Sequence, residues 1–199
     1  MPDVITFGEA MVRLAPPNFR RLEQARSLDV QVGGAELNTA VALARLGRST
    51  AWVSRLTNNP LGRLIANHAR EAGVATDHVA WTTEDRVGLY FLEFGAAPRA
   101  SSVHYDRKDS AIARIRPGMI DWPAVLGGVR WFHVTGITPA LGPGAAEVTR
   151  DALRAGACCL GVGGQLVEPK AVAERNFERI RDLARQYVAI VQQTRKSMV

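Results

Sequence analysis

Cysteine is almost missing from this sequence: the only two, Cys158 and Cys159, are adjacent in a chain of 199 residues. Neighbouring residues on a strand point to opposite faces of the sheet, so these two are badly placed to bridge each other. The sequence offers no disulfide framework, and we expect a reducing compartment. The four histidines show no metal-ligand spacing with one another or with the cysteines: His68, His78, His104 and His133.

Long apolar runs and runs of like charge are also absent. No stretch approaches the ~18 residues needed to span a bilayer. The start, MPDVITFGEAMVRL, has no basic region before a long apolar core, so we interpret it as a buried first strand of a cytoplasmic protein. The net charge is +6, but Lys and Arg are dispersed and not interleaved with aromatics. We therefore expect neither a nucleic-acid nor a membrane partner.

Several common catalytic and cofactor motifs are missing as well. The dinucleotide fingerprint G-x-G-x-x-G, the P-loop G-x-x-x-x-G-K-[ST], H-E-x-x-H and G-x-S-x-G do not occur in the sequence. Their absence argues against the most frequent dinucleotide, P-loop, zinc protease and serine hydrolase classes.

What the sequence does contain is an alternation of strand-like and helix-like segments, in which the first three helices are each closed by a glycine. This order predicts an α/β fold with a mostly parallel sheet flanked by helices, and a small β lid from the pair 87–94 and 101–105. The other expected strands are 3–8, 28–34, 50–56, 129–136 and 157–162, and the expected helices are 35–47, 60–73, 142–156 and a long amphipathic one from Phe177.

The most informative stretch is VGGAELNTAVALARLG, residues 32–47. Two glycines end a strand, and glycine there lets the backbone approach a ligand closely. Asn38 offers both donors and acceptors to sugar hydroxyls. From the residues alone, a ligand site and an ordinary strand–turn–helix are about equally supported.

The first 150 residues resemble the ribokinase-like, or PfkB, family of carbohydrate kinases, with the closest likeness to its 2-keto-3-deoxygluconate kinases. The resemblance rests on six segments in matching order: ITFGEAMVRL, VGGAELNTAVALARLG, NNPLGRLI, GLYFLEF, VHYDRKDSAIA and WFHVTGITPALG. It implies ATP-dependent phosphorylation of a small sugar acid with Mg. One departure is Asn58 and Asn59, where many relatives have an acidic residue.

The resemblance also implies a substrate site beneath the lid. Its residues would be Gly34, Ala35, Glu36, Leu37, Asn38, Tyr90, Tyr105 and Arg107. The chemistry agrees, because an arginine fork suits a carboxylate and tyrosines offer both an apolar face and a hydroxyl. Read without the flanking matches, the segment around Arg107 would be a solvated charge cluster at a hairpin end.

Residues 151–199 do not continue this likeness but resemble the C-terminus of 2-keto-3-deoxy-6-phosphogluconate aldolase, a (β/α)8 barrel. The turn GVGG would then be an anion-binding turn formed by Gly161, Gly163 and Gly164. We assign no Schiff-base role to Lys170, which lies outside any matching motif and is better explained as a solvated lysine.

Two domains are therefore expected: 1–150 as the N-terminal part of a sugar kinase with its lid, and 151–199 as an aldolase-like strand and helix. The Gly-Ala-Gly-Asp motif that supplies the catalytic Asp in the kinase family does not occur here. We accordingly expect a C-terminally truncated kinase without catalytic residues or an ATP–Mg site. The alternative is a non-catalytic fragment of a kinase–aldolase fusion that binds sugar or forms a homodimer through the lid sheet.

Overall fold

The computed structural model describes residues 1–156 and 169–196. It divides into two compact units, Met1–Ala155 and Gly156–Val199, and each is described by itself. The predicted strand 157–162 and the predicted anion-binding turn at Gly161, Gly163 and Gly164 lie outside the described residues, as do Cys158 and Cys159.

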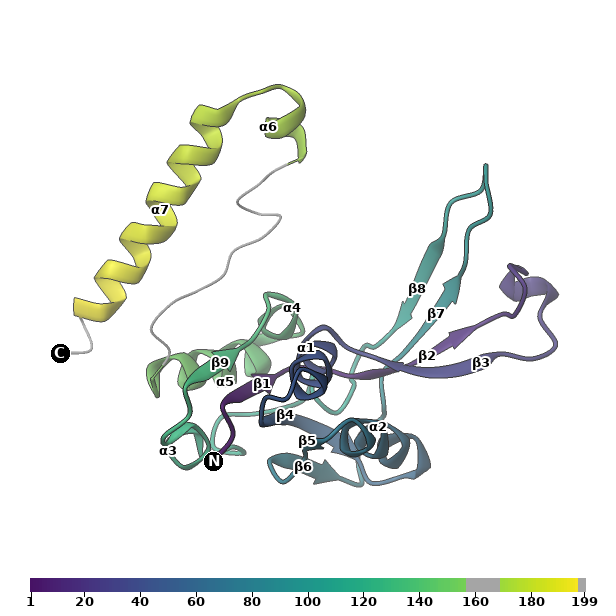
Figure 1. The fold of residues 1–199 in the computed structure, drawn as a ribbon, viewed down its shortest axis with the longest axis horizontal. Coiled ribbons are helices and arrows are strands. Elements are labelled where there is room, and N and C mark those ends of the chain that lie inside the picture. The colour runs from purple at the N-terminus through teal and green to yellow at the C-terminus, as the bar shows by residue number, and fades with distance from the viewer. Residues whose placement is uncertain (157–168, 197–199) are drawn as a thin grey trace. The chain divides into compact units, whose positions relative to one another are not determined.

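The first unit is built on a parallel sheet with the strand order β5–β4–β1–β9, and β6 pairs with the later part of β4 (Figure 1). The strands are β1 (Val4–Phe7), β4 (Thr50–Thr57), β5 (Val74–Ala75), β6 (Val79–Thr82) and β9 (Trp131–His133). In the register of the two central strands, Val4 lies opposite Thr50 and Phe7 opposite Val53. Parallel pairing of this kind requires helical crossovers, which the sequence supplies between the strands.

Helices cover both faces of this sheet, as the alternating sequence predicts. On one face lie α1 (Ala35–Arg45) and α2 (Pro60–Glu71), and on the other α3 (Trp122–Leu126) and α5 (Pro143–Arg154), with α4 (Ile137–Ala140) between β9 and α5. Asn59 caps α2, because its side chain accepts a hydrogen bond of 2.9 Å from the Gly62 N–H. Pro60 follows at the first helical position, where proline is favoured. The helix starts are therefore encoded locally.

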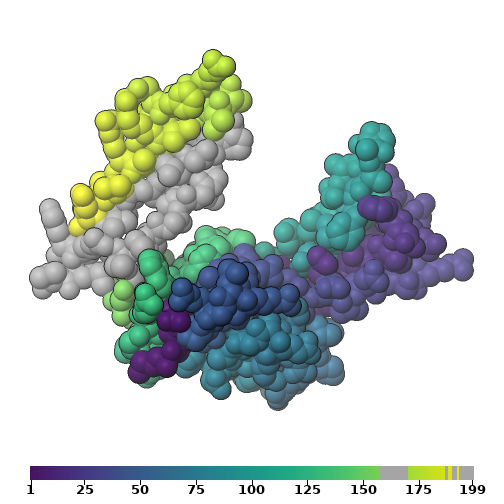
Figure 2. All heavy atoms as spheres, viewed as in Figure 1, coloured from purple at the N-terminus to yellow at the C-terminus, as the bar shows by residue number. Residues whose placement is uncertain are grey.

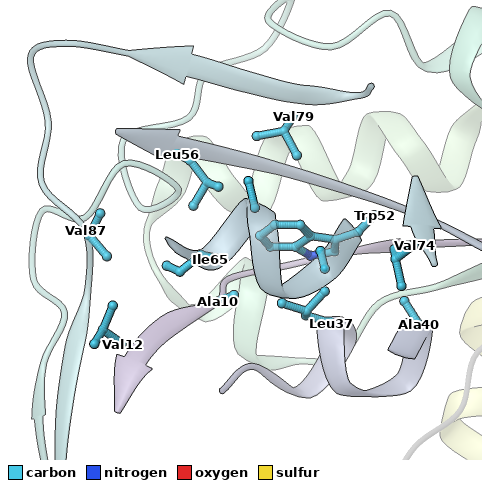
Figure 3. Close-up of a cluster of buried hydrophobic side chains, with 12 residues drawn as sticks. Ala10, Val12, Leu37, Ala40, Trp52, Leu56, Ile65, Val74, Val79 and Val87 are labelled. Carbon is cyan, nitrogen blue, oxygen red and sulfur yellow. The ribbon is translucent and has the colours of Figure 1, made fainter. Parts of the chain in front are cut away.

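The side chains of β4 alternate between the two cores. Trp52 points to the cluster with α1 and α2, while Ala51 and Val53 point to the cluster with α3 and α5. Figure 3 shows Trp52 packed beside Leu37 of α1, with Ile65 of α2 in the same cluster. All five of these side chains are fully or almost fully buried. The body of the unit is thus a three-layer α/β/α sandwich.

A second, smaller sheet stands apart from this body and forms the lid sheet (Figure 2). Its strands run in the order β3–β2–β7–β8, where β2 and β7 are parallel and the outer pairs antiparallel. They are β2 (Met11–Ala15), β3 (Asp29–Gly33), β7 (Leu89–Glu93) and β8 (Ser102–Asp106), with a 3-10 turn η1 at Leu22–Gln24 between β2 and β3. The predicted small β lid is present, and β7 and β8 form the expected hairpin.

The predicted first strand 3–8 is confirmed as the buried β1, and the segment after Gly8 adds β2 of the lid sheet, which the sequence did not separate from it. The apolar sequence of 129–136 predicts a buried strand, and this prediction is wrong at Trp131, whose side chain is 60% exposed. In the part of the chain that the structure describes, β9 is the edge of the central sheet, so one of its sides has no strand to cover it.

The second unit contains α6 (Pro169–Ala173) and α7 (Phe177–Lys196). The long amphipathic helix predicted from Phe177 is confirmed. Its apolar stripe is expected to pack on the preceding strand, which lies outside the described residues; Phe177 and Val188 are 64% and 56% exposed. Lys170 on α6 has an 85% exposed side chain, 3.9 Å from Glu174, which confirms that it is a solvated lysine.

Candidate functional site

The glycine pair that ends β3 allows two parts of the molecule to approach α1 closely. A side chain at Gly33 would collide with the hydroxyl of Tyr90, and one at Gly34 with the backbone oxygen of Glu9. Gly34 is the N-cap of α1 in an extended conformation. The glycines are therefore required by the close approach of the lid sheet and of the β1–β2 connection.

Glu36 and Leu37, both assigned to the sugar site by the sequence resemblance, have buried side chains that hold the fold together. Leu37 is 0% exposed and packs in the core with α2. Glu36 is 1% exposed, and its Oε1 accepts hydrogen bonds from the Thr135 N–H at 3.1 Å and the Thr135 hydroxyl at 2.6 Å. Neither side chain faces solvent, so only backbone atoms of these two residues are left to meet a ligand.

Ala35 and Asn38 are the exposed members of the same turn of α1. The backbone N–H of Asn38 donates to the Gly34 carbonyl at 2.8 Å, which fixes the first turn. Its side chain is therefore presented at the surface of the helix start.

The lid sheet brings the two predicted tyrosines together. Tyr90 on β7 lies directly opposite Tyr105 on β8, with ring centroids 5.9 Å apart and planes tilted by 34°. Cross-strand neighbours share one face of a sheet, so both rings lie on the face that also carries Arg13 and Gln31. Tyr105 is 62% exposed. This pair forms an aromatic platform beside the glycines of α1.

Arg107 follows β8 and extends the platform. Its guanidinium carbon is 5.5 Å from the centroid of the Tyr105 ring, a cation–π distance. Nη2 is ion-paired with Oε2 of Glu9, and the side chain keeps 22% of its surface exposed. Tyr90, Tyr105 and Arg107 thus form one continuous surface, as the resemblance implies.

Glu9 is the member of this cluster that the sequence analysis did not single out. Its side chain is 2% exposed, and its Oε1 accepts a 2.5 Å hydrogen bond from the Ser110 hydroxyl. Burial raises the pKa of the Glu9 carboxyl, while Ser110 and Arg107 act in the opposite direction and Glu36 adds to the rise. The available signal was the charged residue directly after the apolar strand β1, within the quoted segment ITFGEAMVRL.

The described residues show neither a metal cluster nor a membrane helix. No group of three or more His, Cys, Asp or Glu side chains in residues 1–156 and 169–196 is placed to hold a metal ion. No described helix is long and apolar enough to cross a membrane.

Comparison with known proteins agrees with this geometry. Residues 1–162 match the description "pfkB family carbohydrate kinase". Over 152 residues the chain is 43% identical to the 2-dehydro-3-deoxygalactonokinase of Haloferax volcanii, covering 76% of this chain and 47% of that protein. It is 30% identical over 141 residues to the 2-dehydro-3-deoxygluconokinase of Bacillus subtilis, covering 70% and 43%.

Among solved structures, the 2-dehydro-3-deoxygluconokinase of Thermotoga maritima superposes with a TM-score of 0.75 at 47% identity, covering 77% of this chain and 47% of that one. The chain spans about half the length of the curated relatives it matches. The matched half contains the central sheet, the lid sheet and all the site residues discussed above. The chain belongs to the pfkB family of carbohydrate kinases.

Proposed function

We propose that this chain binds a 2-keto-3-deoxy sugar acid, such as 2-keto-3-deoxygluconate, where the lid sheet meets the body. The observation that carries the proposal is the joint surface of Tyr90, Tyr105 and Arg107 beside Gly33 and Gly34. The names of the two curated relatives and of the solved structure support this class of substrate. Because those names include both a galactonate and a gluconate derivative, the proposal extends to the class rather than to one compound.

Each part of the surface suits one part of such a ligand. A guanidinium has five N–H donors, so Arg107 can pair with Glu9 through Nη2 and still donate to a second carboxylate. The tyrosine rings offer apolar faces to the sugar carbons and hydroxyls to its oxygens. Asn38 at the start of α1 can serve the sugar hydroxyls.

Calorimetric titration of the chain with 2-keto-3-deoxygluconate tests the proposal. Arg107→Ala removes the guanidinium and is expected to weaken binding at least about tenfold, since charge-assisted hydrogen bonds contribute roughly 1.5–3 kcal/mol. Arg130→Ala is the matched control, because Arg130 pairs with Asp3 at the opposite end of β1. No binding by the wild type, or equal binding by the Arg107 variant, contradicts the site.

Phosphoryl transfer from ATP with Mg is the activity of the family, and we propose that this chain alone performs it poorly or not at all. The sequence contains no Gly-Ala-Gly-Asp motif, and phosphoryl transfer depends on charge stabilisation at the transferred group. A coupled assay of ATP turnover in the presence of the sugar acid tests this. Turnover at a rate typical of kinases, about 1–100 per second, contradicts it.

A second candidate function is that of a non-catalytic fragment that forms a homodimer through the lid sheet. The supporting observation is that the outer strands of the lid sheet expose apolar side chains on both faces, Val30 at 50% on one face and Val103 at 43% on the other. Both lie on outer strands of the lid sheet, so a second copy can reach them. Light scattering is expected to give the mass of a dimer, and a monomeric mass at high concentration contradicts this role.

The aldolase likeness of residues 151–199 also remains a proposal, as part of a kinase–aldolase fusion. An aldolase of this kind needs a desolvated lysine for its Schiff base, and Lys170 is exposed. Borohydride treatment with pyruvate is therefore expected to leave the chain unlabelled. A labelled adduct would show that an aldolase centre operates in this chain.

A further inference from the structure

Glu9 occupies the crossing point between the body and the lid sheet. The chain passes between the two sheets four times: at Gly8–Ala10, at Gly34, between β6 and β7, and after β8. Glu9 itself belongs to the first of these connections. Its backbone oxygen lies against Gly34, and its side chain reaches Gly88 and Ser110 in the other two connections.

The contacts are close on every side. The Glu9 backbone oxygen lies against Gly34, and a side chain at Gly88 would come within 2.9 Å of Glu9 Oε1. The Ser110 hydroxyl donates to the same Oε1 at 2.5 Å. Arg107 pairs with the other oxygen, Oε2. A side chain with 2% exposure in this position has almost no freedom to move.

The immobile Glu9 side chain in turn fixes the side chain of Arg107. One edge of its guanidinium is fixed on Glu9, and its carbon lies 5.5 Å from the Tyr105 ring centroid. The side chain is 22% exposed, while its Nε is buried and has no hydrogen-bond partner among the described residues. A free arginine side chain carries about 2 kcal/mol of rotamer entropy, which a fixed one does not lose on binding.

We propose that Glu9 is a positioning residue, which holds the Arg107 guanidinium so that its free edge meets the carboxylate of the sugar acid at the tyrosine platform. The inference rests on the proposed function, since it names the group that orients the acid-binding arginine. Glu9 does not touch the ligand, because its own side chain is buried. It acts through Arg107.

Glu9 can act on the affinity for the sugar acid in two ways, and removing Glu9 would change the affinity in opposite directions in the two cases. As a counter-charge, Glu9 competes with the ligand carboxylate for Arg107, so its removal would strengthen binding. As a positioning group, it pre-orients Arg107, so its removal weakens binding. The burial of Glu9 favours the second effect, because a guanidinium that loses a fixed, buried partner also loses its fixed geometry.

Glu9→Gln tests the inference with minimal change of shape, because glutamine keeps an oxygen for Ser110 and removes the charge that holds Arg107. Calorimetry is performed with 2-keto-3-deoxygluconate and with its uncharged amide. We expect the acid to bind about tenfold more weakly and the amide to change less than about twofold. Glu147→Gln is the control, because Glu147 pairs with Arg150 on α5, outside the lid sheet and its connections.

A purely structural role predicts a different pattern. If Glu9 only supported the fold, Glu9→Gln would weaken binding of the acid and of the amide by the same factor. That result overturns the inference, as does tighter or unchanged binding of the acid. Arg107→Lys is expected to lose the same preference for the acid over the amide. The variant that carries both Glu9→Gln and Arg107→Lys is expected to show no further loss, because each substitution already removes the Glu9–Arg107 pair.

A ligand-free measurement separates this inference from the proposed function. The Nη2–H resonance of Arg107, the group that pairs with Glu9, is assigned by its loss in Arg107→Lys. It is expected to be protected from exchange in the wild type and to exchange at least about tenfold faster in Glu9→Gln. If the wild type binds no sugar acid but shows this protection, the proposed function fails and the fixed pair stands. If protection is equal in both proteins, Glu9 does not position Arg107.

Discussion

Arg107, just after the last strand of the lid sheet, is ion-paired with the buried carboxylate of Glu9, just after the first strand of the central sheet. The pair joins the two sheets at the place where Tyr90 approaches Gly33. It therefore ties the residues that suit a sugar acid to the scaffold that carries them. Rigid support of this kind is what a binding group requires to discriminate its ligand.

A substitution at Gly34 tests the close approach of the Glu9–Ala10 backbone to the start of α1. Gly34→Ala is expected to destabilise the protein by about 1–3 kcal/mol, because the new methyl group meets the Glu9 backbone oxygen and the Ala10 Cα. Urea unfolding monitored by tryptophan fluorescence measures the change. Gly136→Ala is the control: nothing lies within 4 Å of its added methyl group, and its φ of −65° suits alanine. Equal stability of the two variants would contradict the packing.

Alanine substitutions at Leu37 and Leu46 compare a buried and an exposed leucine of the same helix, α1 and its C-cap. Leu37→Ala is expected to lower the free energy of unfolding by about 2–5 kcal/mol, because Leu37 is 0% exposed. Leu46→Ala, at a side chain that is 78% exposed, is expected to stay within about 0.5 kcal/mol. Thermal and urea unfolding measure both. A stable Leu37→Ala protein with impaired sugar binding would restore Leu37 to the ligand site.

Glu36 is expected to matter for stability more than for ligand binding. Glu36→Gln replaces a buried acceptor of hydrogen bonds from the Thr135 N–H and hydroxyl, and its new N–H₂ group has no evident acceptor. A loss of about 1–3 kcal/mol follows. Glu71→Gln, at an exposed position near the end of α2, serves as the reference substitution. An unchanged unfolding midpoint for Glu36→Gln would show that these hydrogen bonds contribute nothing.

The raised pKa of Glu9 predicts that the protein loses stability from this group as the pH rises. Burial raises the pKa of Glu9 above its ordinary value of 4.5, so the folded protein holds this proton to higher pH than the unfolded chain does. Stability from this group is then lost as the pH rises from 4.5 through the raised pKa. The groups that face Glu9 are Arg107, Ser110 and Glu36.

Glu9→Gln removes that titration. Its free energy of unfolding relative to the wild type is therefore expected to increase with pH across this interval, as measured by urea unfolding at steps between about pH 4 and pH 8. Asp106→Asn should stay nearly flat relative to the wild type over this interval, since Arg86 lowers the pKa of Asp106 from its ordinary value of 3.8 and the linked change in stability lies below that value. A relative stability of Glu9→Gln that is flat or falls with pH contradicts a raised pKa.

Much of this architecture could be predicted from the sequence because the signals are local. Apolar runs ended by glycine indicate the strands, and Pro60 after Asn59 marks the start of α2. The lid hairpin follows from two strand-like segments close in sequence, so the pairing of Tyr90 with Tyr105 could be anticipated. These features depend on neighbours along the chain.

The features that sequence reasoning missed depend on neighbours in space. Glu9 looks like an ordinary surface charge until Ser110 and Arg107 are folded against it. Glu36 has polar character that suits a sugar, yet Thr135, which occupies its carboxylate, is far along the chain. Leu37 had a usable signal, because its spacing with Val41 and Ala44 already marked the core face of the helix.

The most direct test is the structure of this chain crystallised with 2-keto-3-deoxygluconate. The account predicts that the sugar acid lies against the rings of Tyr90 and Tyr105, with its carboxylate within hydrogen-bonding distance of Arg107 and with Arg107 still paired to Glu9. A sugar acid bound elsewhere, or bound here with its carboxylate turned away from Arg107, would contradict the account.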